Sequence, residues 1–360
     1  MDTTRKTFPY LSADAFACPT DRRALENLQR VPLLPKLFDM IAKMSWDRLS
    51  YVMNSATSVR VGPEQFPTLY QIHREACETL AVPEPELYVQ YSPVVNASTS
   101  GLSRTYVVVH SALLDACTND EIRFVLGHEL GHVKSGHVKY LMLAQTLMPL
   151  ITQLGGMIPG GQKVVELASM ALVSGLYEWL RQAEFTCDRA GLLACQDTHA
   201  ALSAVMKMGC GNSRFSGEMN VDAFLEQARQ HTEMAGMDKV NKVLQFLFFT
   251  WNLDHPQTVF RARELDAWAS GGAYQRILGG DFLMDATGGR QAGPRVRCRN
   301  CGKDGLPANQ AHCPGCGRNP LGPPSAKEAE VVGGTPCTNC EQPLPPKVTF
   351  CPECGHRAGS

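Results

Sequence analysis

Residues 118–138 have the sequence TNDEIRFVLGHELGHVKSGHV, which predicts the helix on which the rest of the fold depends. Thr118 and Glu121 stand at the spacing of a capping box, in which each side chain bonds to the other residue's backbone. The helix should therefore begin at about Asn119. It contains an H-E-x-x-H sequence.

The H-E-x-x-H sequence places His128 and His132 one helical turn apart, so both imidazoles project from one face and can bind one zinc ion. Zinc lowers the pKa of bound water, and Glu129 stands next to the first histidine, where it can take the proton as a general base. The alternative is an ordinary amphipathic helix with histidines on its surface.

A catalytic zinc takes three protein ligands and leaves one position for water. Glu184, in the helical stretch RQAEFTCDRAG, is the candidate third ligand, and Asp188 follows one turn later, where it can bond to a ligand histidine. The alternative is a solvated face on which these carboxylates pair with Arg181 and Arg189.

HELGH, followed about fifty residues later by E-x-x-x-D, resembles the gluzincin peptidase family of HtpX and the CAAX prenyl endopeptidases. The resemblance extends from about Gly62 to about Ala267 and includes VNASTSG and DHPQTVFRARELDAW. It implies an α+β, mostly helical fold with a small sheet, in agreement with the strand patterns ELYVQYS and TYVVVHSAL.

The resemblance implies a zinc metalloendopeptidase in which His128, His132 and Glu184 bind zinc and Glu129 is the general base. It also implies that an extended substrate, a peptide or an unfolded protein, pairs with an edge strand. The candidate contacts are Asn96, Ala97, Ser98 and Thr99. A role in protein quality control fits the same family.

Two features depart from the family pattern. Integral-membrane members have clear spanning helices, whereas here only the uncharged stretch 140–162 stands in that place, interrupted by polar residues and prolines. This stretch predicts a helical hairpin on the core or, alternatively, peripheral membrane contact. Cys187 replaces the usual alanine before Asp188.

Three further residues are weaker candidates. His255, in a His-Pro pair, would stabilise the developing oxyanion as a catalytic residue, or would merely lie at the first turn of a helix. Arg261 is expected to form an ion pair that holds that helix. His137 is expected to be a flanking surface or core histidine and not a ligand.

The last 63 residues contain eight of the fourteen cysteines, arranged as four C-x-x-C pairs in two similar modules. Each module is typical of a zinc ribbon, in which four thiolates enclose a structural zinc ion and a glycine after a knuckle allows the tight turn. The first set is Cys298, Cys301, Cys313 and Cys316, and the second is Cys337, Cys340, Cys351 and Cys354. We therefore expect three zinc ions, one catalytic and two structural.

The composition changes after Gly279 to glycine, proline, arginine and cysteine, which predicts a boundary. The expected domains are an N-terminal helical extension (1–62), the peptidase domain (63–279), a linker (280–296), the first ribbon (297–319), a Pro/Gly-rich linker (320–336) and the second ribbon (337–358).

Composition limits the partners. With 34 basic and 35 acidic side chains the chain has no global positive field, so nucleic-acid binding would depend on the arginines near the first ribbon, where no aromatic side chain is available for stacking. The ribbons are expected to dock a protein partner. A non-catalytic adaptor that acts through the ribbons is the alternative function.

The N-terminus has no apolar secretory core, and the six cysteines outside the ribbons are scattered singly. A reducing cytoplasm is the expected compartment, with peripheral membrane association as the alternative.

Overall fold

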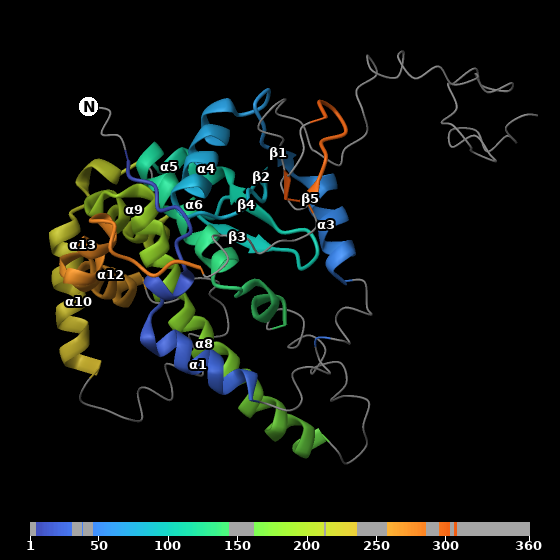
Figure 1. The fold of residues 1–360 in the computed structure, drawn as a ribbon. Coiled ribbons are helices and arrows are strands. Elements are labelled where there is room, and N and C mark those ends of the chain that lie inside the picture. The colour runs from blue at the N-terminus through green and yellow to red at the C-terminus, as the bar shows by residue number, and fades with distance from the viewer. Residues whose placement is uncertain are drawn as a thin grey trace, which may run out of the picture. The chain divides into compact units, whose positions relative to one another are not determined.

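The computed structural model of the chain describes residues 5–30, 38, 46–143, 162–211, 214–235, 258–285, 295–302 and 306–307 (Figure 1). Residues Met1–Gln291 form the first unit and Ala292–Ser360 the second. Each unit is described separately.

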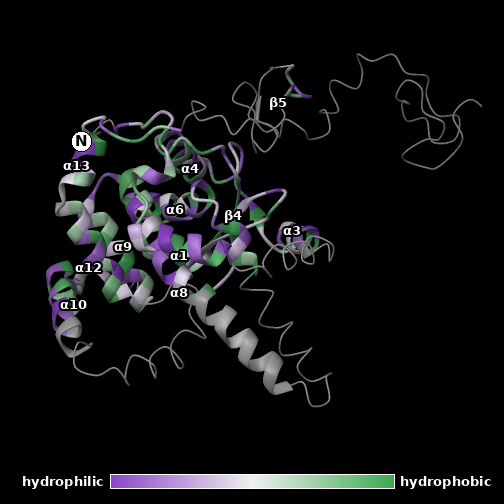
Figure 2. Cartoon of the chain, turned by 60° about the horizontal axis from the view of Figure 1, so that its bottom comes forward, coloured by the Kyte–Doolittle hydropathy of each residue, from purple (hydrophilic) through white to green (hydrophobic). Residues whose placement is uncertain are grey.

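Helices dominate the first unit, and their order follows the predicted pattern. They are η1 (Ala13–Ala15), α1 (Pro19–Gln29), α3 (Trp46–Thr57), α4 (Pro67–Thr79), α5 (Ser111–Ala116), α6 (Asn119–Lys134), α8 (Gln162–Cys195), α9 (Thr198–Cys210), η2 (Ser216–Glu218), α10 (Val221–Ala235), α12 (Thr258–Ser270) and α13 (Gly272–Leu278). In Figure 2, hydrophilic and hydrophobic positions both occur around α10, as in an amphipathic helix.

A small sheet completes this unit, and the predicted strands within 86–92 and 105–113 are confirmed. The strands are β1 (Val59–Arg60), β2 (Glu86–Gln90), β3 (Ala97–Ser100) and β4 (Tyr106–His110), in the order β1-β2-β4-β3. β2 and β4 are parallel, with Val89 opposite Val109, and β3 runs antiparallel to β4 at one edge of the sheet.

Helix α6 begins at Asn119, as predicted, and its capping box is present. The backbone N–H of Thr118 donates to Glu121 Oε2 at 2.6 Å, and the Glu121 N–H donates to Thr118 Oγ1 at 3.4 Å. Lys207 and Ser203 of α9 also donate to the Glu121 carboxylate, at 2.7 and 2.6 Å. The start of the H-E-x-x-H helix is thus fixed both locally and by α9.

Helix α6 packs closely on α8 because glycine occupies the contact. A Cβ atom on Gly131 would lie 2.9 Å from the Cβ of Ala190 and 3.0 Å from the Cα of Cys187, closer than real Cβ atoms normally approach. The second glycine of the H-E-x-x-H region therefore sets the distance between the two helices that carry the predicted ligands.

The N-terminal segment is part of the same core. Phe8, Leu11 and Phe16 are buried in one cluster with residues of α4, α6 and α9. Helix α1 runs alongside α8 (blue beside yellow-green in Figure 1), and Leu28 joins Trp179 and Tyr140 in a second cluster. Residues 5–30 therefore bury apolar surface against the H-E-x-x-H unit.

The uncharged stretch 140–162 is described only in part, because residues 144–161 lie outside the described residues. Tyr140 and Leu143 are buried against Trp179. Across the described helices, none combines the length and the apolar character that crossing a membrane requires.

The second unit is described at residues 295–302 and 306–307. Strand β5 (Arg295–Val296) pairs antiparallel with β6 (Leu306–Pro307). Between them the Gly302 N–H donates to the carbonyl of Cys298 at 2.9 Å, and Gly302 has a φ of 75°, the left-handed conformation that the predicted tight turn requires.

Candidate metal centre

Helices α6 and α8 bring three predicted ligands together. Nε2 of His128 lies 3.4 Å from Glu184 Oε2, and Nε2 of His132 lies 3.4 Å from Glu184 Oε1. All three side chains are buried. The alternative predicted for the carboxylates of α8, a solvated charged face, is wrong because Glu184 and Asp188 are both buried.

The donor set and its spacing fit a zinc ion. Two imidazole nitrogens and a carboxylate are ligands that zinc prefers, and a tetrahedral site with bonds of about 2.1 Å has ligand–ligand distances of about 3.4 Å. The two N–O distances in this structure have that value. The two distances therefore agree with the spacing of neighbouring ligands in a tetrahedral zinc site.

His128 has a strongly charged set of neighbours. Its Nδ1 lies 2.9 Å from Asp188 Oδ1, so an N–H at that position donates to the carboxylate. Arg261 of α12 donates from Nε and Nη2 to Asp188 at 2.8 and 2.6 Å, and its Nη1 lies 3.4 Å from Glu184 Oε2. The ion pair expected of Arg261 is present, and its partners are the two carboxylates of the site.

These neighbours shift the pKa values of the cluster. Burial disfavours protonated His128, but Glu184 and Asp188 outweigh burial and raise the pKa of His128 to about 9. Burial acts against ionised Asp188, yet Arg261 and His128 lower the pKa of that carboxyl. Metal binding must therefore displace a proton from His128 at neutral pH.

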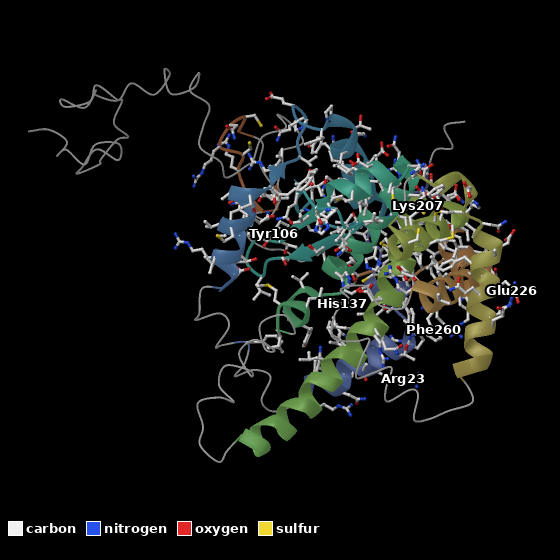
Figure 3. The ribbon with its side chains drawn as sticks, turned by 180° about the vertical axis from the view of Figure 1, so that it is seen from behind. Arg23, Tyr106, His137, Lys207, Glu226 and Phe260 are labelled. Carbon is white, nitrogen blue, oxygen red and sulfur yellow. The ribbon has the colours of Figure 1, made fainter. Side chains whose placement is uncertain are left out.

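His132 differs from His128 in both neighbours and charge. Burial lowers the pKa of His132, so it is neutral at neutral pH, the form that binds a metal. Its Nδ1 lies 3.4 Å from Nδ1 of His137, which is buried as the sequence allowed. In Figure 3, His137 lies beside α8, where its ring packs edge-on against Trp179 with centroids 5.3 Å apart.

The predicted base is tied to the sheet. Thr99 of β3 lies within hydrogen-bond distance of two oxygens of Glu129: Oε2 at 2.6 Å and the carbonyl at 3.2 Å. Glu129 and Thr99 are both buried. A bond from Thr99 to Oε2 therefore holds the carboxylate in one orientation.

Cys187 also lies near the histidines. Its Sγ and one nitrogen from each of His128 and His132 fall within 4.8 Å of one another, a grouping that could hold a metal ion. Burial raises the pKa of the Cys187 thiol well above its usual range, so the sulfur is protonated at neutral pH. Metal binding at Cys187 would have to release this thiol proton, whereas the ionisable carboxylate of Glu184 lies 3.4 Å from both Nε2 atoms.

The predicted substrate segment lies at the edge of the sheet. Ala97, Ser98 and Thr99 belong to β3, and Asn96 directly precedes it, with its carbonyl accepting the N–H of His110 at 3.0 Å. Thr99 links this strand to Glu129. An extended peptide added at this edge would run next to the base.

Several predicted site residues lie outside the described residues: His255, Cys313, Cys316 and all four cysteines of the second ribbon. Of the first ribbon, Cys298 is buried and Cys301 is exposed, and they flank the turn that ends at Gly302. In the described part of the second unit, the geometry is that of one C-x-x-C turn.

Asp21 is a site residue that no motif or spacing in the sequence indicates. This residue of α1 is buried, and Trp179 Nε1 and Thr186 Oγ1 donate to it at 3.0 and 2.6 Å. More than 150 positions separate it from these partners, so no local spacing connects them.

A helix with H-E-x-x-H, a buried glutamate from a second helix and a carboxylate behind the first histidine define the class of metallopeptidases. The description "Peptidase family M48" matches residues 63–269. The chain belongs to peptidase family M48 and is a zinc metalloprotease.

Individual proteins are similar to the chain. "Plastoglobule-localized metallopeptidase 48, chloroplastic" of Arabidopsis thaliana is 35% identical over 274 residues, which cover 75% of this chain and 77% of that protein. "Protease HtpX homolog" of Arthrobacter sp. (strain FB24) is 29% identical over 181 residues, 46% of this chain and 63% of that protein. The crystal structure of S. mikatae Ste24p is similar with a TM-score of 0.34 and 19% identity, covering 72% of this chain and 68% of that one.

Proposed function

We propose that the chain is an endopeptidase that hydrolyses peptide bonds of protein substrates, with zinc held by His128, His132 and Glu184 and with Glu129 as general base. The observation that carries this proposal is the convergence of both Nε2 atoms on the Glu184 carboxylate, 3.4 Å away in each case. The hydrogen bond between Thr99 and Glu129 supports the role of the base.

Bound zinc would lower the pKa of water and polarise the peptide carbonyl. Glu129 then takes a proton from the attacking water and transfers it to the leaving amine. Thr99 keeps the Glu129 carboxylate in one orientation during both transfers. Asp188 holds His128 in the tautomer that presents Nε2 to the metal, and Arg261 keeps Asp188 ionised.

Substrate binding is proposed at the edge strand. An unfolded or extended segment would pair with the backbone at Asn96, Ala97, Ser98 and Thr99, which brings its scissile bond near Glu129. Because pairing of this kind uses backbone groups, it accepts many sequences, as a protease of protein quality control requires. His255 is proposed to stabilise the oxyanion.

We propose two structural zinc ions in the ribbons, bound by Cys298, Cys301, Cys313 and Cys316 and by Cys337, Cys340, Cys351 and Cys354. The turn closed by the Gly302 N–H on the Cys298 carbonyl supports the first site. The ribbons are proposed to recruit a protein partner or substrate. We propose the same domain limits as those expected from the sequence, with a peptidase domain followed by two ribbons.

The cytoplasm is the proposed compartment. The six cysteines outside the ribbons are scattered singly along the sequence, which supports reducing surroundings. Peripheral contact with a membrane through 140–162 is the alternative. It is supported by the Arabidopsis relative, which is named as plastoglobule-localized.

The central test is Glu129→Gln. We expect cleavage of an unfolded casein substrate to fall by about 10³-fold because the amide cannot accept the proton. Zinc content, measured by native mass spectrometry, should not change. Glu226→Gln is the matched control, since this glutamate is exposed on α10 and pairs with Arg229 (Glu226 is labelled in Figure 3). Unchanged cleavage by Glu129→Gln would refute the proposed mechanism.

Zinc counting tests the ligands. The full chain should bind three zinc ions, and the double variant His128→Ala/His132→Ala should bind two. Equal counts in the two proteins would refute the catalytic site, whereas a loss of one ion assigns it to this pair of histidines.

A further inference from the structure

Asp21 has no part in the mechanism given so far, although it is among the most buried carboxylates described, with 3% of its surface exposed. It belongs to α1, outside residues 63–269 that match the peptidase family. A buried carboxylate is costly unless it is bonded. The hydrogen-bond partners of Asp21 therefore indicate its role.

Three side chains face Asp21. Trp179 donates to Oδ1 at 3.0 Å, Thr186 donates to Oδ2 at 2.6 Å, and Nε2 of His137 lies 3.3 Å from Oδ2. Burial acts against the ionised form, but bonds from His137, Thr186 and Trp179 lower the pKa of Asp21. Asp21 is therefore a carboxylate at neutral pH and can only accept hydrogen bonds.

The proton positions follow from this charge. A proton on Nε2 of His137 faces the Asp21 carboxylate, which can only accept, and this arrangement leaves Nδ1 of the ring as an acceptor. That atom lies 3.4 Å from Nδ1 of His132. His132 directs Nε2 toward Glu184, so its own proton is on Nδ1 and points to His137. The three residues form one consistent donor–acceptor chain.

We propose that Asp21 and His137 are positioning residues for the metal centre, with Asp21 fixing the tautomer and orientation of His137 and His137 fixing those of His132. The inference rests on the proposed function, in which His132 binds zinc. Outer partners of this kind orient a ligand histidine and increase its basicity. The N-terminal segment thus supplies part of the metal centre.

Neighbouring groups favour this role. His137 is 1% exposed, and the Trp179 ring packs against it edge-on, which restricts its rotation. Sγ of Cys187 lies 3.7 Å from His137 Nδ1 and also faces the acceptor side of the ring.

The test compares Asp21→Asn, His137→Ala and the double variant in the full chain. Native mass spectrometry counts the zinc ions bound at increasing chelator concentrations, and the ion that His128→Ala/His132→Ala lacks is taken as the catalytic one. We expect each single variant to weaken binding of that ion by about 10-fold or more. Since Asp21 acts through His137, the double variant should be no weaker than His137→Ala.

Thr186→Val is the control for a purely structural role. It removes a bond between α1 and α8 but keeps the contact of Asp21 with His137. We expect a lower Tm and an unchanged zinc affinity. A loss of affinity equal to that of Asp21→Asn would overturn the proposal, as would losses that add in the double variant.

The outcomes separate this inference from the proposed function. If wild type and His128→Ala/His132→Ala bind equal numbers of zinc ions, the catalytic site itself fails. If wild type binds the additional ion and both Asp21→Asn and His137→Ala bind it equally well, only the positioning role fails. Should Asp21→Asn not fold, His137→Ala decides alone, because it leaves the bonds from Trp179 and Thr186 to Asp21 in place.

Discussion

The two histidines of H-E-x-x-H are one helical turn apart, but their surroundings are built differently. His128 bonds directly to a carboxylate that a buried arginine clamps with two bonds, and all three residues lie within the matched peptidase region. His132 faces a second histidine, His137, and the carboxylate behind that ring, Asp21, comes from outside that region. The surroundings of His128 are therefore supplied by the matched peptidase region alone. The surroundings of His132 also require helix α1.

This difference indicates that the two arrangements fail in different ways. A buried ion pair that loses one partner leaves a charge in a low dielectric, which destabilises the whole fold. A hydrogen-bonded relay that loses one member changes the orientation and basicity of a ligand at a smaller cost. The following experiments distinguish the His128 side, which contains Asp188 and Arg261, from the His132 side, which contains His137 and Asp21. They begin with the largest expected effect.

Arg261→Met breaks the His128 side. It leaves Asp188 and Glu184 buried without their cation, and we expect the free energy of unfolding to fall by about 3–5 kcal/mol, measured by urea denaturation, together with loss of the catalytic zinc. Arg263→Met is the matched control on the same helix. Its ion pair with Glu264 is about one third exposed, so it should cost at most about 1 kcal/mol. Equal losses in both variants would contradict the clamp.

Gly131→Ala disturbs both sides together by separating α6 from α8. The added Cβ would meet Ala190 and the backbone of Cys187, and overpacking of this kind costs about 1–3 kcal/mol. Zinc affinity should fall as well, because the histidines move away from Glu184. Gly217→Ala, where a Cβ meets nothing within 4 Å, should leave both quantities unchanged. A neutral result for Gly131→Ala would show that the helices can separate without cost.

The pH dependence of zinc binding should distinguish the two histidines. The pKa of His128 is raised from 6.5 to about 9, so its proton stabilises the metal-free fold below pH 6.5, and that contribution is lost as the pH rises through 9. Zinc must displace this proton, and its affinity should rise by about tenfold per pH unit, about 1.4 kcal/mol, until the pKa is reached. His132, whose pKa is lowered, should contribute no slope at neutral pH.

Calorimetry in buffers of different ionisation enthalpy measures the protons released. The signal of His128→Ala/His132→Ala is subtracted to remove the ribbon thiols. Asp188→Asn removes one cause of the raised pKa and should make the slope end at a lower pH. If Asp188→Asn leaves the slope of zinc affinity against pH unchanged, the displaced proton does not belong to His128.

Thr99→Val should affect neither histidine. It removes the hydroxyl that orients Glu129, and we expect kcat to fall by about fivefold, about 1 kcal/mol, with KM and zinc content unchanged. Thr105→Val is the matched control, since that hydroxyl donates to the Gly101 carbonyl instead. An accompanying loss of zinc would show that β3 also supports the metal ligands.

The sequence was sufficient for the parts of the site that local spacing determines. The capping box and the i, i+4 histidines follow from helical periodicity, and the choice of Glu184 and Asp188 required in addition that α8 fold back on α6. The partners of Arg261 could not be predicted, because its spacing to His128 and Asp188 reflects how α12 packs and not a repeat along the chain.

Asp21 and Thr99 show why the other contacts of the site could not be predicted from the sequence. Thr99 was expected to contact substrate, whereas in the structure its hydroxyl lies within hydrogen-bond distance of Glu129, a pairing across 30 positions that depends on where β3 meets α6. Asp21 had the appearance of an ordinary acidic residue in the first turn of a helix, a position that favours negative charge by itself. Only tertiary packing distinguishes it from such a residue.

The long sequence separations within the site bear on the order in which a ribosome makes this enzyme. Asp21 is synthesised 158 residues before Trp179 and 165 before Thr186, and His128 precedes Arg261 by 133 residues. A nascent chain that already contains both histidines therefore lacks the helices that complete their surroundings. The protease should gain its activity only when α12 has emerged, so unfinished chains on neighbouring ribosomes are not exposed to its incomplete copies.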